Sequence, residues 1–476
     1  MKLYNTLSRK VEEFKPANGK SASLYTCGPT VYDYYHIGNL RNAVFNDTLR
    51  RTLEASDYDV KHVMNITDVG HLVSDADEGE DKLEKGAARE GKTVWEVAEH
   101  YTDAFKADMA AMNVLPPNAY KNSKHHDNYA RATDFIDEQI EMVKLLVDKG
   151  FAYQTKQAIY FDVTKLPDYG VLTGQRLADK EVGARRDVVT DPDKQNPHDF
   201  AVWFFAVGHF ANHTMQWESP WGNGFPGWHL ECSAIVHATL GDPIDIHTGG
   251  TDHIGTHHPN EMAQTEAAFG HPLARFWVHN EFILVDGAKM SKSKHNSFTL
   301  KDVTDRGFDP LALRLLYLQA HYRTELNFSW ENLEAAQNRL QELRALADLR
   351  WQPKKETMHL TYYDTYTESI LEHIQNDLNT PMVLAVVSGL TNDLEEAVPP
   401  ENIDEFMSLL QLIDDVLGLE LLSSKDLSNV QKEALGERQK AREDKNFTES
   451  DQLRDQLKEQ GIGVRDTDQG QIWYRL

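Results

Sequence analysis

Four residues of metal-ligand type are spread over distant parts of the chain. Cys27 and Cys232 are its only cysteines, and His257 and Glu261 stand four positions apart in the run His257-His-Pro-Asn-Glu261. Two thiolates, an imidazole and a carboxylate make a plausible site for Zn²⁺. His258 is a rival to His257 as the imidazole ligand. Pro259 suits the first turn of a helix, which would put His257 just before the helix and Glu261 within it. Their spacing of four still lets them converge, but no local rule joins them to the cysteines.

A second set of residues has the chemistry of a phosphate site. Residues 24–26 predict a buried strand, Gly28 breaks it, and His36-Ile-Gly38-Asn39 precedes a helical pattern. A strand, a turn and a helix start direct backbone N–H groups and the positive helix end at an anion. Gly38 lets a ligand approach the backbone, and His36 can hydrogen-bond or charge-pair with phosphate. An ordinary turn histidine is the alternative for His36.

A third stretch, Lys289-Met-Ser-Lys292-Ser293, follows a flexible Gly287-Ala288 pair. Such a loop can place mobile ammonium groups on a triphosphate. Surface loops rich in lysine and serine are common, so the loop gains meaning only together with the His36 motif. Asp252 follows two glycines and could accept hydrogen bonds from ribose hydroxyls, or serve only as a turn residue.

The elements that must position these residues follow an α/β pattern. Residues 60–67 predict a strand with Thr67 at its carboxyl end, where ligands bind in open α/β sheets, and 93–112 predict a helix. A helix starting at Trp228 would carry Cys232, and 245–252 predict a strand and a glycine turn. We therefore expect a Rossmann-type parallel-sheet catalytic domain, interrupted by an inserted connective subdomain and followed by a mainly α-helical region.

We divide the chain into five segments on these patterns. The catalytic domain comprises 1–115 and, with the lysine loop, 216–300, and the connective insertion is 116–215. In the insertion we predict a helix over 128–149 and a hairpin over 151–162. A helical stem follows at 301–395, and a carboxyl-terminal region at 396–476. Within these two segments we predict long helices over 332–351 and 366–396, then one helix and an extended end within 432–476.

Composition restricts the class of protein. The 476 residues suffice for about three domains. No run of about 18 apolar residues exists and Met1-Lys-Leu-Tyr-Asn5 lacks an apolar signal core, so we expect a cytoplasmic protein with no membrane span. A disulfide between Cys27 and Cys232 is accordingly disfavoured. A net charge of −26 argues against a general nucleic-acid binder, but a structured RNA can still dock on a local basic face.

Taken together, these motifs resemble the class I aminoacyl-tRNA synthetases. Over essentially its full length the chain is similar to bacterial-type cysteinyl-tRNA synthetases. The matching pieces are Cys27-Gly-Pro-Thr-Val-Tyr-Asp33, His36-Ile-Gly-Asn39, Asn65-Ile-Thr-Asp68, Ser219-Pro-Trp-Gly222, Gly227-Trp-His-Leu-Glu-Cys-Ser233, His257-His-Pro-Asn-Glu261, Lys289-Met-Ser-Lys-Ser293 and His321-Tyr-Arg-Thr-Glu-Leu-Asn-Phe328.

The resemblance implies a ligase that joins L-cysteine to tRNA(Cys) with ATP and Mg²⁺, in a chain that we expect to be a monomer. The residues that it implicates are Cys27, Cys232, His257 and Glu261 for one zinc ion per chain, Cys27, Thr67 and Trp228 around the amino acid, His36, Gly38, Asn39, Asp252 and Lys292 for ATP, and His36, Asn39, Lys289 and Lys292 for catalysis. The segment 396–476 would read the anticodon.

The sequence departs from the family at several positions. Asn39 stands where histidine is frequent, and Gly255-Thr256 replaces a more apolar pair. One alternative is a cysteine ligase of the mycothiol pathway, which resembles the same core. It would have no use for the tRNA-reading end that Lys440 to Phe447 and Asp451 to Asp455 resemble. The other is a non-catalytic RNA-binding paralogue, which only Asn39 supports.

Overall fold

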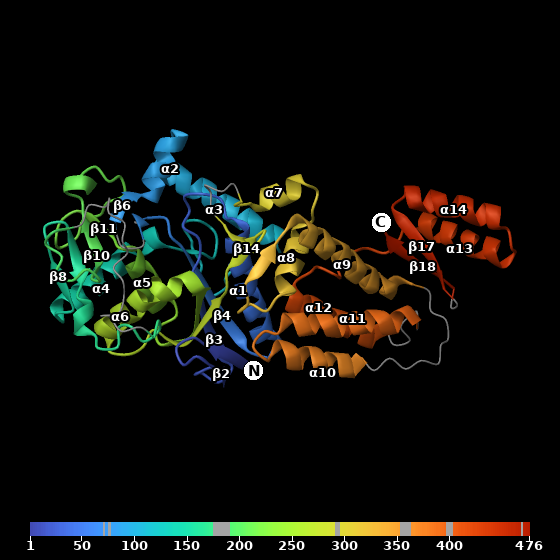
Figure 1. Cartoon of the computed structure of the whole chain (residues 1–476), viewed down its shortest axis with the longest axis horizontal. Coiled ribbons are helices and arrows are strands. Elements are labelled where there is room, and N and C mark those ends of the chain that lie inside the picture. The colour runs from blue at the N-terminus through green and yellow to red at the C-terminus, as the bar shows by residue number, and fades with distance from the viewer. Residues whose placement is uncertain are drawn as a thin grey trace. The chain divides into compact units, whose positions relative to one another are not determined.

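The computed structural model of the chain describes residues 1–69, 72–74, 78–174, 191–290, 296–352, 363–396, 403–467 and 470–476 (Figure 1). It divides into two compact units. The first contains Met1–Asp302 and Tyr322–Asn327, and the second contains Val303–His321 and Phe328–Leu476. Among the described residues, no helix combines the length and apolar character needed to traverse a bilayer.

A five-stranded parallel sheet forms the centre of the first unit. Its strand order is β13-β12-β3-β4-β7. The strands are β3 (Ser21–Thr26), β4 (Asp59–Ile66), β7 (Ala130–Arg131), β12 (Ile244–Gly250) and β13 (Ala274–Asn280). Leu24, Tyr25, Val63, Ile246 and Trp277 are fully buried in it. Burial of neighbouring strand residues on both faces is typical of parallel sheets covered by helices, and the expected Rossmann-type fold is confirmed.

Helices follow the strands and complete the α/β pattern. They are α1 (Ile37–Ala55), α2 (Lys82–Glu90), α3 (Val94–Ala111), α4 (Ile136–Asp148), α5 (Trp228–Thr239) and α6 (His257–Phe269). Register places Tyr25 beside His247 and Val63. The carboxyl ends of β12, β3 and β4 therefore lie side by side, and the residues that follow these strands meet at one edge of the sheet.

An antiparallel sheet of order β11-β10-β9-β8 lies within the same unit. Its strands are β8 (Ala152–Gln154), β9 (Ala158–Phe161), β10 (Phe200–Phe205) and β11 (Gly224–Pro226), so the hairpin predicted over 151–162 is confirmed. The helix predicted from 128 begins only at Ile136. The residues before it pair with β4 as β7, and then form one 3₁₀ turn, Ala132–Phe135. Shorter strands are β1 (Lys2–Asn5), β2 (Lys10–Glu13), β5 (Leu72–Ser74), β6 (Glu78–Asp81), β14 (Ile283–Val285) and β15 (Ala288–Lys289).

The second unit is mainly helical. Its elements are α8 (Pro310–Leu318), α9 (Trp330–Asp348), α10 (Tyr363–Ile374), α11 (Thr380–Glu396), α12 (Ile403–Leu417), α13 (Asn429–Glu443), α14 (Phe447–Glu459) and the hairpin β17 (Ile462–Thr467) and β18 (Gly470–Arg475). Two short elements, α7 (Leu300–Asp305) and β16 (Leu326–Phe328), span the division between the units.

Two predictions for this unit were wrong. The helix predicted over 366–396 is two helices, because Asp377 and Leu378 adopt positive φ angles of 60° and 55° that an α-helix cannot continue through. The single helix predicted in the last segment is also two, α13 and α14, and Lys445 between them has a φ of 59°. Apolar periodicity correctly predicted a helix on each side of both breaks, but it did not predict the breaks themselves.

A candidate active site with a buried cluster of metal-ligand residues

A cavity of about 450 Å³ opens at the carboxyl edge of the parallel sheet. Its lining includes most of the residues that the sequence predicted for the site, namely Cys27, His36, Asn39, Thr67, Trp228, Cys232, Asp252 and His257. Gly38, Glu261 and Lys289 are not among the lining residues, and Lys292 lies outside the described part of the chain. The fold thus brings together in one cavity residues that are more than two hundred positions apart.

His36 caps the amino terminus of α1. Its Nδ1 accepts hydrogen bonds from the N–H groups of Gly38 at 3.1 Å and Asn39 at 3.2 Å. Asn39 Oδ1 accepts in return from the N–H of His36 at 3.3 Å, which completes a capping box. Because Nδ1 is an acceptor, the ring proton of neutral His36 is on Nε2. A neutral His36 therefore has an N–H group for an anion bound at this helix end.

The turn after β3 depends on Gly28. A Cβ at this position would lie 1.8 Å from the carbonyl oxygen of Asn65, so only glycine fits. The Gly28 N–H donates to Asn65 Oδ1 at 2.8 Å, and Asn65 Nδ2 donates to Thr67 Oγ1 at 3.1 Å. This chain of contacts holds Cys27, at the start of the turn, and Thr67, at the end of β4, on the same cavity.

The four predicted metal-ligand residues converge. One ligand atom from each of Cys27, Cys232, His257 and Glu261 lies within 4.8 Å of all the others, and all four residues are buried. His257 and Glu261 share the first two turns of α6, with Nε2 and Oε1 2.5 Å apart. Ligand atoms of a tetrahedral zinc site are about 3.4–3.8 Å apart. The arrangement is a candidate metal site, in which His257 Nε2 and Glu261 Oε1 would have to move apart for both to ligate one ion.

The four residues of this cluster differ in protonation state in the absence of a metal. A hydrogen bond from Cys27 lowers the pKa of the Cys232 thiol to about 6, whereas burial raises the pKa of Cys27 well above its ordinary value. Burial alone would lower the pKa of His257, but Glu261 and Cys232 outweigh it and raise the pKa to about 10. Burial likewise opposes ionisation of Glu261, but His247 and His257 lower its pKa. Cys232 and Glu261 are thus buried anionic donors, and a divalent cation would bind with release of the protons that Cys27 and His257 hold.

Sequence reasoning named His258 as a rival ligand but missed His247, and the two belong to a second set of four donors. Cys27, His247, His258 and Glu261 also offer ligand atoms within 4.8 Å of one another. His247 Nε2 lies 2.5 Å from Glu261 Oε2, and His258 Nε2 lies 3.6 Å from Cys27 Sγ. His258 Nδ1 in turn lies 2.7 Å from His279 Nε2. A histidine at a buried position of a core strand, as His247 is in β12, was the available signal. His257 therefore stands beside both cysteines, and His258 stands beside Cys27.

Trp228 and Asp252 occupy other parts of the cavity. Trp228 is the first residue of α5, and its ring stacks on His257 with centroids 4.3 Å apart and an interplanar angle of 27°. Asp252 lies in a 3₁₀ turn directly after β12 and keeps 63% of its side chain exposed. Its carboxylate is therefore accessible to a ligand in the cavity.

The two signature stretches are neighbours in the fold. The N–H of Ile37, next to His36, donates to the carbonyl of Phe298 at 2.8 Å. Met290 lines the cavity, and its Cε would lie 2.6 Å from a Cβ on Gly38. Lys289 is exposed in β15, with Nζ 5.4 Å from the ring centre of Phe282. Met290 and Phe298, described residues at the start of the lysine loop and beyond it, therefore adjoin the His36 motif.

Comparisons with known proteins agree with this site. Residues 13–338 match the class I tRNA synthetase (C) catalytic domain, and 424–473 match the cysteinyl-tRNA ligase anticodon binding domain. A cysteine--tRNA ligase 1 of Burkholderia lata is 44% identical over 98% of this chain and 96% of its own. A cysteine--tRNA ligase of Treponema denticola is 39% identical over 100% of both.

Solved structures support the fold alone, because their sequence identity is low. A Mycobacterium tuberculosis methionyl-tRNA synthetase aligns with a TM-score of 0.57 and 15% identity over 84% of this chain and 90% of its own. An Agrobacterium radiobacter leucyl-tRNA synthetase aligns with a TM-score of 0.60 and 12% identity over 86% of each chain.

The parallel sheet, the capped start of α1 and the match of residues 13–338 to a class I catalytic domain define a class I aminoacyl-tRNA synthetase. Within that class, the chain belongs to the cysteinyl-tRNA synthetase family, whose activity is cysteine--tRNA ligation.

Proposed function

We propose that the chain activates L-cysteine with ATP and transfers the cysteinyl group to the 3′ end of tRNA(Cys). The observation that supports this most directly is the convergence of the four-donor cluster with the His36 motif. Cys27, Cys232 and His257 line the same cavity as His36 and Asn39. A thiol-selective centre and an anion-binding helix start are thus close enough to hold one cysteinyl-adenylate.

Cys27, Cys232, His257 and Glu261 would hold one zinc ion per chain. The fit rests on the donor chemistry, the burial of all four residues and the 4.8 Å limit on their ligand-atom separations. When bound, zinc would supply selection of cysteine over serine, because a soft thiolate ligates it and a protonated hydroxyl does not. A discrimination of this kind needs no separate editing site.

We assign the small substrates to the remaining cavity residues. Thr67 and Trp228, with Cys27, would surround the amino acid. Nε2–H of His36 and the amide of Asn39 would donate to the phosphates of ATP, and Mg²⁺ bound with the nucleotide would offset phosphate charge. Two further residues would contribute to ATP binding: Gly38 through its backbone, and Asp252 by accepting from ribose hydroxyls.

The reaction that these residues would support has two steps. A carboxylate oxygen of cysteine attacks the α-phosphorus of ATP, and the bond to the departing pyrophosphate breaks. The terminal ribose hydroxyl of the tRNA then attacks the carbonyl carbon and releases AMP. Lys289 and Lys292 would neutralise the departing pyrophosphate, so the chain acts by positioning and charge stabilisation without a covalent intermediate.

The division of the chain completes the proposal. We assign 1–115 and 216–300 to the catalytic domain, 116–215 to a connective insertion, 301–395 to a helical stem and 396–476 to anticodon recognition. The match of 424–473 to an anticodon binding domain supports the last assignment. We further propose a monomer that acts in the cytoplasm.

The test is cysteine-dependent exchange of pyrophosphate into ATP, measured on the full chain with zinc content determined on the same sample and serine as competitor. We expect exchange with cysteine but not with serine, and about one zinc per chain. Transfer to tRNA(Cys) should then follow. Exchange without transfer to tRNA would favour a ligase acting on an amino-sugar, and zinc binding without exchange would favour a non-catalytic paralogue.

A further inference from the structure

An exposed tyrosine stands at the mouth of the cavity. Tyr34 lines the cavity together with His36, yet 49% of its surface remains exposed. Tyr34 is not among the residues that we assign to cysteine or to ATP. Large aromatic side chains at a cavity mouth that remain half exposed are suited to stack on a planar ligand.

The ring of Tyr34 is held in place by α3. Its hydroxyl is hydrogen-bonded to His100 Nε2 at 3.0 Å. The ring of Tyr101 makes an edge contact with it, with centroids 5.0 Å apart and an interplanar angle of 83°. The ring of His100 makes a second edge contact at 5.9 Å. A side chain fixed on this many sides loses little further freedom when a ligand stacks on it.

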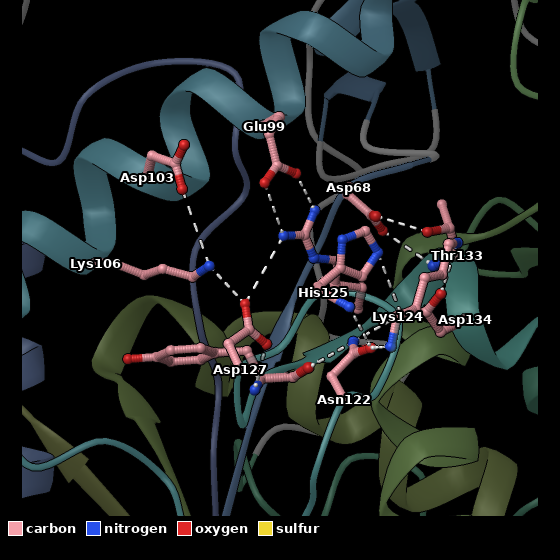
Figure 2. Close-up of polar contacts among 12 residues, drawn as sticks. Asp68, Glu99, Asp103, Lys106, Asn122, Lys124, His125, Asp127, Thr133 and Asp134 are labelled. Carbon is pink, nitrogen blue, oxygen red and sulfur yellow. Dashed lines mark hydrogen bonds and ion pairs between the residues drawn. The ribbon is translucent and has the colours of Figure 1, made fainter.

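An ion-pair network anchors α3 close to these residues (Figure 2). Glu99, which precedes His100, accepts from the buried guanidinium of Arg131 at 2.6 Å. About two helical turns after Glu99, Lys106 of α3 pairs with Asp127 at 2.5 Å. Arg131 is a residue of β7, so α3 is tied directly to the edge of the parallel sheet. The support of Tyr34 is therefore part of the rigid catalytic fold.

Positive charge lies beside Tyr34 on α2, which packs against α3 (Figure 1). Lys82, Lys85 and Arg89 recur at positions i, i+3 and i+7 and so share one face of the helix. Lys82 also lines the cavity, and its Nζ lies 5.4 Å from the ring centre of Tyr32. Arg89 donates to Tyr101 at 3.2 Å and is also paired with Glu90 at 3.0 Å. A cationic helix face thus runs into the aromatic residues at the cavity mouth.

This face is unusual in a chain whose net charge is −26. Between positions 82 and 92 four lysines and arginines stand against two glutamates. We call Tyr34, His100, Tyr101 and the three cationic residues of α2 the cationic–aromatic rim. Phosphates track cationic side chains and bases stack on aromatic ones, which is the chemistry of single-stranded nucleic-acid sites.

We propose that the cationic–aromatic rim binds the single-stranded 3′ end of tRNA, with the terminal base stacked on Tyr34 and the preceding phosphates along Lys82 and Lys85. The proposal rests on the proposed function, because it names the surface by which that reaction receives its second substrate. The position of Tyr34 at the mouth would place the terminal ribose at the cavity in which the adenylate forms.

The test separates amino-acid activation from transfer. Tyr34→Ala should leave cysteine-dependent ATP–pyrophosphate exchange within about 2-fold of the wild type and lower kcat/KM for tRNA by about 10- to 100-fold. Tyr34→Phe keeps the stacking ring, so its transfer should stay within about 3-fold of the wild type. Trp95→Ala is the matched control, because Trp95 lies on α3 and is 48% exposed but is not among the cavity residues. It should change neither reaction.

Two further measurements identify the partner group. Removing the terminal adenosine from the tRNA should weaken binding to the wild type but not to Tyr34→Ala. The reason is that the loss of the adenosine and the loss of the ring remove the same contact. Lys85→Ala should make the slope of the logarithm of the tRNA binding constant against the logarithm of salt concentration shallower by about 0.7.

Failure of the proposed function and failure of this proposal give different results. A wild-type chain without cysteine-dependent exchange contradicts the function, whatever Tyr34 does. Loss of exchange in Tyr34→Ala would make Tyr34 a small-substrate residue, and equal transfer by the wild type and Tyr34→Ala would leave the rim without an RNA role. An equal loss of transfer to tRNA in Trp95→Ala would show that the effect is not specific to Tyr34. Each of the last three results, which concern Tyr34→Ala and Trp95→Ala, overturns the proposal of an RNA-binding rim.

Discussion

His36 and Asn39 hold each other across the first turn of α1. Nδ1 of His36 accepts from the N–H of Asn39 at 3.2 Å, and Oδ1 of Asn39 accepts from the N–H of His36 at 3.3 Å. Asn39 stands where histidine is frequent in this family, and its amide can donate a hydrogen bond to phosphate but cannot become cationic. The structure adds a role that the sequence did not show, because Asn39 also closes the cap that orients His36.

The two roles of Asn39 can be separated. Asn39→Ala should lower the free energy of unfolding by about 0.5–2 kcal/mol, as loss of a cap does, and should also slow exchange. Asn39→Asp retains an oxygen acceptor for the His36 N–H and places a negative charge at the positive helix end. It should keep wild-type stability in urea unfolding and still lose exchange, because its carboxylate repels phosphate. Wild-type exchange in Asn39→Asp would remove Asn39 from phosphate binding.

Cys232→Ser should lose zinc and cysteine activation while the fold survives. One ligand of a buried cluster is removed, but the parallel sheet does not depend on it. Zinc content and exchange should both fall by an order of magnitude or more, while the far-ultraviolet circular dichroism spectrum stays that of the wild type. A variant that still prefers cysteine to serine would refute the zinc assignment.

The two overlapping donor sets predict different effects of histidine substitutions. If zinc uses the set with Cys232, His257→Ala should abolish stoichiometric zinc binding and His258→Ala should leave it nearly intact. If zinc uses the set with His247, His258→Ala should abolish stoichiometric zinc binding and His257→Ala should leave it nearly intact. Measured zinc affinity decides between them, because substitution of the histidine that only contacts a ligand should lower the affinity by about 10- to 100-fold and leave the site able to bind.

The stability of the fold should depend on pH through His62. This side chain is buried in β4 with Nε2 2.9 Å from Thr26 Oγ1, and burial lowers its pKa to about 3. The folded state therefore keeps it neutral where the unfolded state takes up a proton. Its contribution is complete above pH 6.5 or so and is lost as the pH falls from there toward 3. The loss is on the order of a few kcal/mol.

His62→Gln isolates this contribution from the other acid titrations. The difference in free energy of unfolding between the wild type and the variant should shrink as the pH is lowered from 7.5 to 5 in urea unfolding. A difference that stays constant over this range would show that His62 is not the titrating group.

Gly418 should tolerate no side chain. Its φ is +63°, and a Cβ would lie 2.5 Å from a guanidinium nitrogen of the fully buried Arg314. Gly461 has a φ of +77° with nothing within 4 Å, so it is the matched control. Gly461→Ala should cost about 1–2 kcal/mol for the backbone conformation alone, and Gly418→Ala clearly more. Equal costs in thermal or urea unfolding would mean that Arg314 moves aside freely.

Local spacing in the sequence determined much of this protein. The strand–turn–helix unit around His36, the helix that carries Cys232, the pairing of His257 with Glu261 and the hairpin over 151–162 were all predicted. Each depends on periods of 2 or 3.6 residues and on glycine or proline at fixed offsets, which short stretches of sequence carry by themselves. The breaks at Leu378 and Lys445 are single-residue backbone conformations that apolar periodicity does not encode.

Only the tertiary structure decided which distant residues share a site. Cys27 and His247 come together because β3 and β12 are neighbours in the parallel sheet, and strand order is set by packing of the whole unit. The same packing places His279 behind His258 and Met290 against Gly38. Tyr34 became a candidate RNA contact only when α2 and α3 surrounded it with charge and aromatic edges, since contacts across such sequence distances have no local signature.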